Sequence, residues 1–306
     1  MENLTGEESM ERKPLDGGAA GLMVLLCAIW GLQQVAVKVA APALNPVLQI
    51  GLRSLVATGL LLLVMHLRGS PLTLRHVSLR PGLAAGSLFA IEFLFVAWGL
   101  LYTTASHMVV FLYITPVFTA LGLHWRVAGE RLVRRQWLGV TFAFTGLVVA
   151  FSGSLFRLDE SGVALMLLGD AFGVLAGLLW AATTVLIRST SLSEAPAPQT
   201  MFYQLAMAGI FLSVVGALFF QDGRVVMTPI AWLSMAYQTV IVGFASMLTW
   251  FWLLRRYLAS RMSVFTFLTP LFGVAFGVWL LDDPLDPAFL AGAILVCLGI
   301  VLVNRR

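Results

Sequence analysis

The sequence predicts an all-helical integral membrane protein whose ten transmembrane helices form two inverted repeats of five helices each. Three observations predict this fold. Hydrophobic residues make up 59% of the 306 residues and charged residues only 11%, and the mean hydropathy is +0.92, more apolar surface than a soluble domain needs. The apolar residues form long continuous runs rather than short alternating strands. The second half of the chain also repeats landmarks of the first half.

Ten apolar segments are long enough to be membrane helices, which need about 20 mostly apolar residues to cross a hydrocarbon core of about 30 Å. In the first half we expect helices over residues 19–41, 46–67, 82–102, 106–124 and 135–152. In the second half we expect helices over residues 162–187, 198–220, 229–253, 262–281 and 287–304. The predicted domains are a cytoplasmic N-terminal tail (1–18), a first repeat (19–152), a linker (153–161) and a second repeat (162–304).

The repeat is visible in the order and spacing of landmarks. The sequence W-G-L-Q-Q-V-A-V-K, from Trp30 to Lys38, returns about 150 residues later as W-A-A-T-T-V-L-I-R, from Trp180 to Arg188. Further landmarks return in the same order: Trp98 as Trp252, Ile114-Thr115-Pro116 as Leu268-Thr269-Pro270, Gly139 as Gly292 and Gly146 as Gly299. Because each half holds an odd number of predicted crossings, the second copy enters the bilayer from the opposite side. Inverted repeats of this kind are typical of alternating-access transporters.

The distribution of arginines predicts the orientation, because Lys and Arg in short loops are retained on the cytoplasmic side. With a cytoplasmic N-terminus, the outside loops hold only Arg157 and Arg224, whereas the inside loops hold most of the other arginines. We therefore expect both termini in the cytoplasm. The formal net charge of +4 follows from this asymmetry, so we expect no nucleic-acid partner.

Motifs for energy coupling or catalysis are absent from the sequence. The chain has no G-x-x-x-x-G-K-[ST] loop for ATP and no H-E-x-x-H zinc motif. Its four histidines are scattered, and Cys27 and Cys297 have no metal-ligand spacing. We therefore expect no enzyme activity, no catalytic residue, no cofactor and no metal.

Several of these features together resemble a known family. The Trp-led helices that end in a basic residue, the mid-helix Pro116 and Pro270, the sequence G-E-R-L at Gly129 to Leu132 and the glycines that follow resemble the EamA-type transporters of the drug/metabolite transporter (DMT) superfamily. The resemblance covers Leu22 to Val303. It departs where the second copy would repeat Gly-Glu, since the chain has Asp282-Asp283-Pro284 there. The resemblance implies a secondary transporter of the bacterial cytoplasmic (inner) membrane, with a central cavity between the repeats, that exports metabolites.

Four ionisable residues lie inside predicted helices, where a charge costs several kcal/mol and usually persists for function: Lys38, Arg53, Glu92 and Asp170. Glu92, near the middle of the third segment, is the strongest candidate, because a carboxylate there can exchange a proton or hold a substrate's ammonium group. Arg53 can clamp a carboxylate through its planar fork, and Asp170 can balance either cation. The structural alternatives stay open: Glu92 as a permanent partner of Arg53 or Lys38, and both cations as interfacial anchors.

Aromatic and amide side chains complete the candidate substrate site. Trp30 and Trp180 stand at equivalent repeat positions, and with Tyr113 they are candidates for lining a cavity that accepts an apolar or aromatic solute. Gln33 and Gln238 add amide groups that need partners inside the bundle. Pro116 and Pro270 remove backbone donors and kink their helices at matching places, so we expect them to act in conformational change.

The function that we expect is export of a small organic solute, an amino acid or related metabolite, by alternating access. Proton antiport through Glu92 is the coupled version. An uncoupled metabolite facilitator or a multidrug-type efflux protein is the alternative, and an intramembrane enzyme is a remote one. The expected partners are the solute, the lipid bilayer and, in the coupled version, protons, and the chain fits a monomer or a homodimer.

Overall fold

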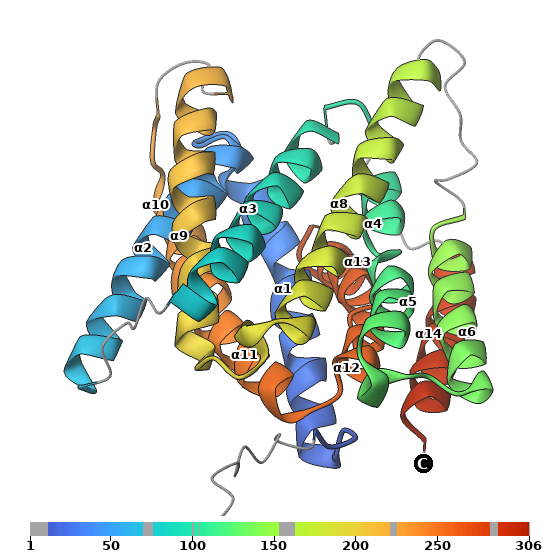
Figure 1. Cartoon of the computed structure of the whole chain (residues 1–306). Helices are drawn as coiled ribbons and strands as arrows, with labels where there is room; N and C mark the ends of the chain where they lie inside the picture. Colours follow the sequence, from blue (N-terminus) through green and yellow to red (C-terminus); the bar gives the residue numbers. More distant parts are fainter. Residues whose placement is uncertain are drawn as a thin grey trace, which may run out of the picture.

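The computed structural model describes residues 12–69, 76–99, 101–103, 105–152, 163–220, 225–281 and 287–305. Within these ranges every named element is a helix, so the predicted all-helical class is confirmed (Figure 1). The first half contains α1 (Gly17–Ala40), α2 (Pro46–Leu67), α3 (His76–Gly99), α4 (Ala105–Leu112), α5 (Thr115–Arg126) and α6 (Arg134–Ala150). The second half contains α8 (Val163–Ser189), α9 (Ala197–Val215), α10 (Pro229–Ala236), α11 (Met247–Arg256), α12 (Ala259–Phe265), α13 (Leu268–Leu281) and α14 (Pro287–Asn304).

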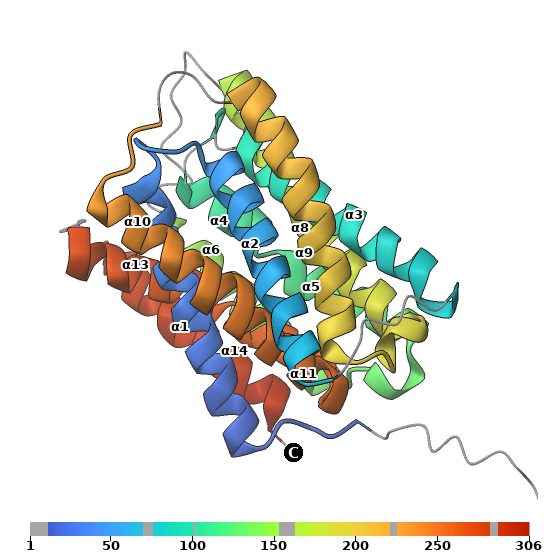
Figure 2. The same cartoon turned by 90° about the vertical axis from the view of Figure 1, so that its left-hand side faces the viewer.

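Short helices of other types extend or join these elements. Two 3₁₀ turns, Ala128–Glu130 and Ser191–Ser193, lie between longer helices. A π-helical stretch, Gly216–Phe220, continues α9, and a second one, Tyr237–Ser246, joins α10 to α11. The long helices share a common slanted direction in the side view (Figure 2).

Seven helices in the described residues are long and apolar enough to cross a membrane: Gly17–Ala40, Pro46–Leu67, Leu79–Gly99, Ala164–Ser189, Ala197–Phe219, Pro229–Arg256 and Ala259–Leu280. Ala288–Asn304 is a shorter apolar helix. Their outer surfaces expose large apolar side chains, such as Leu63 on α2 and Ile210 on α9. Apolar exposure of this kind suits a lipid environment.

Local sequence explains where two of these helices begin. Asp16 precedes α1, and its carboxylate accepts a hydrogen bond of 2.8 Å from the amide of Ala19. Asn45 precedes α2, where its side chain accepts a bond of 2.8 Å from the amide of Val47, and Pro46 occupies the first helical position. A side-chain cap satisfies one of the free amides of the first turn, and proline fits there because its missing donor has no intrahelical partner.

Two expected helices are each split in two, which corrects the predicted boundaries. The segment expected at 106–124 is α4 and α5, with a turn at Tyr113 and Ile114, and the segment expected at 262–281 is α12 and α13. Proline causes the first break, because Pro116 cannot donate to the carbonyl of Leu112 four residues earlier. Thr115 compensates, since its hydroxyl donates to that carbonyl at 2.6 Å.

The third helix also begins earlier than expected, at His76 rather than at residue 82. Pro81 therefore lies inside α3. It falls in the second turn, so it removes only one hydrogen bond near the end of the helix. The predicted linker at 153–161 and the acidic segment at Asp282-Asp283-Pro284 lie outside the described residues.

Helices α6 and α14, one from each half of the chain, pack side by side and antiparallel. A Cβ atom on Gly139 would lie 2.7 Å from the carbonyl oxygen of Gly299, and a Cβ atom on Gly146 would lie 2.7 Å from that of Gly292. Because the earlier glycine of α6 faces the later glycine of α14, the two helices run in opposite directions. Their backbones are in contact, which small residues such as glycine permit. These glycines therefore serve packing within the chain.

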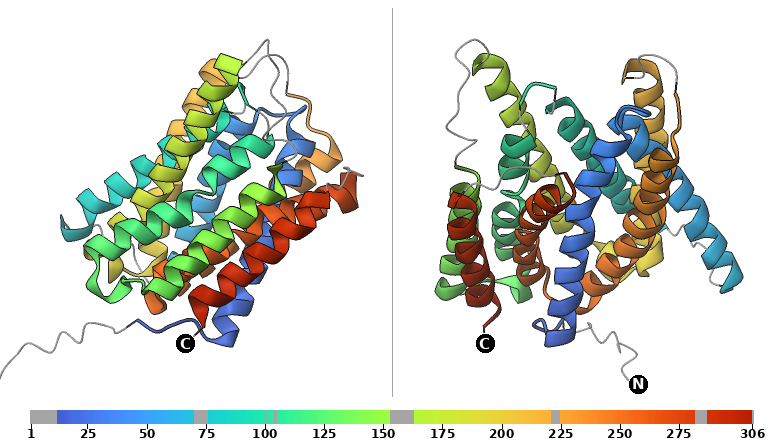
Figure 3. Two further views of the ribbon diagram at one scale, coloured as in Figure 1. Left: turned by 90° about the vertical axis from the view of Figure 1, so that its right-hand side faces the viewer. Right: turned by 180° about the vertical axis from the view of Figure 1, so that it is seen from behind.

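The start of α1 and the end of α14 lie at the same end of the bundle (Figure 3). We call it the basic end, because Arg126, Arg135, Arg188, Arg256 and Arg305 end or begin helices there. The residues before α1 cross this end. The amide of Lys13 donates to the carbonyl of Arg256 at 3.0 Å, and the guanidinium of Arg12 lies 2.8 Å from the carboxylate of Glu194.

Candidate functional site

A cavity of about 180 Å³ lies inside the bundle, between helices from both halves. Residues of α1, α2, α3, α8, α9, α11 and the π-helical stretch Tyr237–Ser246 line it, together with Leu112 at the end of α4 and Tyr113 in the break that follows. Most of the lining is aliphatic or aromatic. Its amide, hydroxyl and charged members are Gln33, Arg53, Ser54, Glu92, Tyr113, Thr183, Thr184 and Gln204. An apolar cavity with a few convergent polar groups is the usual form of a small-molecule site.

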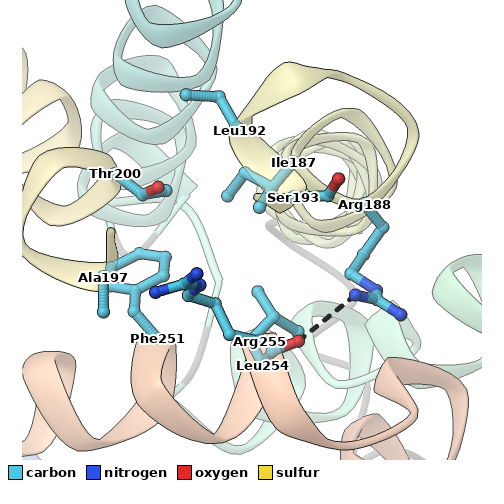
Figure 4. Close-up of a pocket in the computed structure, with 9 residues that line it drawn as sticks. All are labelled: Ile187, Arg188, Leu192, Ser193, Ala197, Thr200, Phe251, Leu254 and Arg255. Carbon is cyan, nitrogen blue, oxygen red and sulfur yellow. Dashed lines mark hydrogen bonds between the residues drawn. The ribbon is translucent and has the colours of Figure 1, made fainter. Parts of the chain in front are cut away.

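A second pocket lies closer to the basic end, between α8, α9 and α11 (Figure 4). Its volume is about 10 Å³, which is about the space of one water molecule. Arg188 borders it and donates to the carbonyl of Leu254 at 3.3 Å. The larger cavity is therefore the candidate site for a solute.

Arg53 of α2 and Glu92 of α3 bring opposite charges to the larger cavity. Their side chains are buried, with Arg53 5% and Glu92 4% exposed. The guanidinium carbon of Arg53 lies 5.6 Å from the ring centre of Phe93. One guanidinium nitrogen of Arg53, Nη1, and one carboxylate oxygen of Glu92, Oε2, have no hydrogen-bond partner in the described part of the chain. Neither residue forms an ion pair there.

Unmatched buried charges are costly, because removing a charged group from water is offset only by pairing or hydrogen bonds. Two of them in one cavity are therefore available to a ligand that supplies the missing partners. A carboxylate suits the planar fork of Arg53. A cationic donor suits Glu92, whose ionised carboxylate only accepts hydrogen bonds.

Two aromatic pairs form further walls of this cavity. The indole nitrogen of Trp30 donates to the hydroxyl of Ser246 at 2.9 Å, and the rings of Trp30 and Trp250 meet edge to face at 5.7 Å. The rings of Tyr113 and Trp180 meet in the same manner at 5.6 Å. These contacts hold flat apolar surfaces beside the charged groups.

The remaining residues expected from the sequence lie in different places. Gln33 lines the cavity, whereas Lys38, Asp170 and Gln238 are not in its lining. Lys38 is exposed, and Asp170 is buried and accepts a hydrogen bond of 2.5 Å from the hydroxyl of Thr103. Six of the nine expected binding or coupling residues thus line one cavity: Trp30, Gln33, Arg53, Glu92, Tyr113 and Trp180.

Gln238 belongs to a buried polar network beside the cavity. Its amide donates to the side-chain oxygen of Gln49 at 2.8 Å and to the hydroxyl of Ser234 at 3.1 Å. Ser234 donates in turn to the carbonyl of Ala36 at 2.6 Å. The network ties α1, α2 and the α10 region together. Pro116 and Pro270 lie in the first turns of α5 and α13, just after the two helix breaks.

Several lining residues were missed by reasoning from the sequence. Gln204, Thr183 and Thr184 are polar residues inside apolar helices, a signal that could have found them. Phe93 gives no such signal, because a phenylalanine in a membrane helix faces lipid as readily as a cavity. Trp250 also lines the cavity, although its position in an apolar helix suits packing or the membrane interface equally well.

A buried ion pair lies at the basic end, beyond the cavity. Glu130 accepts hydrogen bonds from Nε and Nη2 of Arg188, with the Nε contact at 3.1 Å. The same carboxylate accepts from the amides of Ala259 at 2.9 Å and Ser260 at 3.0 Å, and from the hydroxyl of Ser260 at 2.7 Å. Glu130 therefore caps the start of α12.

Comparison with known proteins places this architecture in a family. The model of the EamA-like transporter family matches residues 18–152 and 167–305. A Salmonella typhimurium protein named "Probable amino-acid metabolite efflux pump" is 28% identical over 292 residues, which cover 92% of this chain and 93% of that protein. An Archaeoglobus fulgidus protein named "Uncharacterized transporter" is 25% identical over 290 residues, covering 93% and 96%.

A solved crystal structure shares the fold. Its TM-score is 0.79 at 17% sequence identity, covering 94% of this chain and 98% of the solved chain. Three observations lead to the same conclusion: the apolar helices, the cavity between the two halves, and the family match over most of the chain. This multi-pass membrane protein belongs to the EamA-like transporter family.

Proposed function

We propose that this chain is a secondary transporter that exports a small zwitterionic metabolite, an amino acid or a close relative, across the bacterial cytoplasmic membrane. The observation that carries the proposal is the pair of unmatched, opposite charges, Arg53 and Glu92, in one buried cavity. Both termini face the cytoplasm in this proposal, because the arginine-rich end of the bundle carries them. The relatives named as amino-acid metabolite efflux pumps support both the solute class and the direction.

The proposal includes ten crossings in two inverted repeats, with α4–α5, α10–α11 and α12–α13 each counted as one crossing. The neighbours of each helix support this arrangement. The equivalent helices α2 and α9 pack together, as do α6 and α14. In the proposed repeat α8 is the equivalent of α1, α10 belongs to the equivalent of α3, and α13 is the equivalent of α5. The contact between α3 and α8 then corresponds to the contact between α10 and α1, and the contact between α5 and α8 corresponds to that between α13 and α1. A twofold relation between the halves accounts for every one of these pairs.

The residues that line the cavity also support a twofold relation between the two halves. Gln33 and Val37 follow Trp30 by three and seven residues. Thr183 and Ile187 follow Trp180 by the same intervals, and these six residues all line the cavity. The third and eighth crossings show the same match. Phe93 and Ala97 stand five residues and one residue before Trp98, Met247 and Phe251 stand at the same distances before Trp252, and these four residues also line the cavity. Equivalent surfaces of the two halves therefore face one solute. Rocking of the halves about it gives alternating access.

The charges break this symmetry and define the solute's orientation. Glu92 stands six residues before Trp98, and the equivalent position before Trp252 is Ser246, which already binds Trp30. The first half alone thus supplies both Arg53 and Glu92. The solute's carboxylate binds Arg53, its ammonium group binds Glu92, and its side chain lies against the aromatic walls. The cavity volume of about 180 Å³ is below the range of about 300–1,000 Å³ typical of drug-sized ligands, which favours a metabolite over a multidrug role.

Proton antiport follows if the ammonium group and a proton occupy Glu92 in turn. When the solute leaves outward, an unpaired buried carboxylate remains, and protonation removes that cost. The proton is released when the next solute binds from the cytoplasm. One carboxylate in the cavity gives one proton per cycle.

Uptake by proteoliposomes tests the two charge assignments separately. The probes are labelled amino acids, the matching amines without a carboxylate, and the matching acids without an amino group. Charged hydrogen bonds contribute about 1.5–3 kcal/mol, so Arg53→Gln should weaken amino-acid affinity roughly 10- to 150-fold and leave amine transport unchanged. Glu92→Gln should weaken amino-acid affinity similarly and leave acid transport unchanged. Glu194→Gln, at an exposed ion pair, is the matched control.

Coupling is tested in the same vesicles with and without a pH gradient. Glu92→Gln should abolish gradient-driven accumulation and retain downhill exchange. Intact gradient-driven transport in Glu92→Gln would remove the proton-carrier role. Equal losses for all three solutes in both variants would remove the zwitterion assignment.

A further inference from the structure

The cavity is closed toward the basic end by a short layer of apolar side chains. Ile187 and Phe251 line both the cavity and the one-water pocket beyond it. Leu192 and Leu254, which border that pocket, are also buried. Toward the opposite end the cavity lining extends to Val37 at the end of α1. A solute in this conformation is therefore blocked at the basic end.

The Glu130–Arg188 pair lies directly behind this layer. Arg188 follows Ile187 in α8 and donates to the carbonyl of Leu254, so it is bonded to the layer itself (Figure 4). Glu130 comes from the turn between α5 and α6, in the first half of the chain, whereas the donors to its carboxylate belong to the second half. The pair is thus a contact between the two halves.

The chemistry of the carboxylate suits a contact that forms and breaks. Oε1 of Glu130 accepts from Arg188 and Ala259, and Oε2 accepts twice from Ser260, so the closed state satisfies the group fully. The start of a helix also favours a negative charge. Opening returns both charges to water, and the recovered hydration offsets much of the lost attraction. Such a contact is geometrically specific without making the closed state too stable to open.

We propose that the Glu130–Arg188 pair is the inner gate of the transport pathway, which holds the cavity shut toward the basic end and breaks whenever the cavity opens there. This inference rests on the proposed alternating access. Repeat equivalence supports it, because Lys38 lies in the last turn of α1 as Arg188 lies in the last turn of α8. Lys38 is exposed and has no ion pair in the described part of the chain. The basic end of the pathway is thus closed by an ion pair, whereas the equivalent cation at the other end forms none among the described residues.

A cysteine reporter in the cavity tests the gate without any solute. Thr184→Cys, at a lining position, is introduced with Cys27→Ala and Cys297→Ala, and a membrane-impermeant maleimide is applied to right-side-out and inside-out vesicles. With the gate intact, the reporter should react mainly from the side opposite the basic end. Glu130→Gln leaves Arg188 buried without its counter-charge, so labelling from the basic side should rise about tenfold or more.

Three further variants separate a gate from a permanent brace. Arg188→Gln should raise labelling from the basic side as Glu130→Gln does. The double variant Glu130→Gln with Arg188→Gln should show a smaller rise than either single variant, because no unpaired charge remains buried. Glu194→Gln, which removes an exposed ion pair at the same end, should show no rise.

A folded Glu130→Gln protein whose labelling from the basic side is unchanged would show that the pair is a permanent brace and would overturn the gate. Where Glu130→Gln does not accumulate, Arg188→Lys takes its place, since it keeps the charge and loses the fork, and the same rise is expected. Failure of the proposed function looks different: a reporter that reacts from neither side before any gate substitution would remove the access pathway itself.

Discussion

Replacing Gly146 by alanine should force apart α6 and α14, the antiparallel helices that join the two halves. A Cβ atom at this position would lie 2.6 Å from the backbone nitrogen of Val296, 2.7 Å from the carbonyl oxygen of Gly292 and 2.8 Å from the Cβ atom of Leu295. Ordinary van der Waals contact begins at 3.4 Å, so the overlaps amount to 0.6–0.8 Å. Two of the three atoms are backbone atoms. The helices must therefore move, because no side chain can rotate away.

The magnitude follows from two opposing terms. Overpacking of a close contact costs about 1–3 kcal/mol, whereas alanine is favoured over glycine inside a helix by about 1 kcal/mol. Gly59→Ala isolates the second term, because no heavy atom lies within 4 Å of a Cβ atom at Gly59, which is also inside a helix. The free energy of unfolding should thus be about 1–3 kcal/mol lower for Gly146→Ala than for Gly59→Ala.

Equilibrium unfolding in mixed micelles, followed by tryptophan fluorescence during a titration with sodium dodecyl sulfate, measures this difference. The double variant Gly146→Ala with Gly292→Ala should cost less than the sum of the single variants, because both act on one contact and the first already separates the helices. If Gly146→Ala proved as stable as Gly59→Ala, the backbone contact between α6 and α14 would be refuted.

Two further predictions concern single hydrogen bonds. Trp30→Phe removes the donor to Ser246 while keeping the ring contact with Trp250, so we expect a loss of about 1 kcal/mol in unfolding free energy; a loss that persists in a Ser246→Ala background would contradict this origin. The bond from the amide of Ala19 lowers the pKa of Asp16 below its ordinary 3.8. Its capping contribution is therefore present above that ordinary value and is lost as the pH falls through the lowered pKa. A carbon-13 NMR titration of Asp16 measures the pKa, and an unshifted value would contradict the cap.

Some helices could be placed from the sequence almost to the residue. The segments expected at 46–67 and 287–304 are α2 and α14, with the same bounds. In α2 the reason is local, because Asn45 and Pro46 are start signals that act within one turn. The breaks in the fourth and ninth segments lie just before Pro116 and Pro270, where the sequence predicts kinks. Hydropathy nevertheless gave one continuous segment in each place, because it measures side chains and not the backbone hydrogen bonds that a proline interrupts.

The candidate site, too, could be predicted from the sequence only in part. Arg53 and Glu92 stand out in the sequence because charges are rare in apolar helices, and both line the cavity. Lys38 and Asp170 give the same signal and lie elsewhere. In a soluble helix, periodicity would separate the buried face from the exposed face. A membrane helix is apolar toward lipid as well as toward its neighbours, so the sequence does not record which face a charge occupies.

The sequence by itself determined the helical membrane class and the family resemblance, because both rest on the length, composition and order of segments along the chain. Tertiary structure decided which charges share a cavity, that Glu130 meets Arg188, and that the spaced glycines join α6 to α14. Those contacts bring together residues far apart in the chain. They depend on the rotation and depth of each helix against its neighbours, which are fixed only when the whole bundle packs.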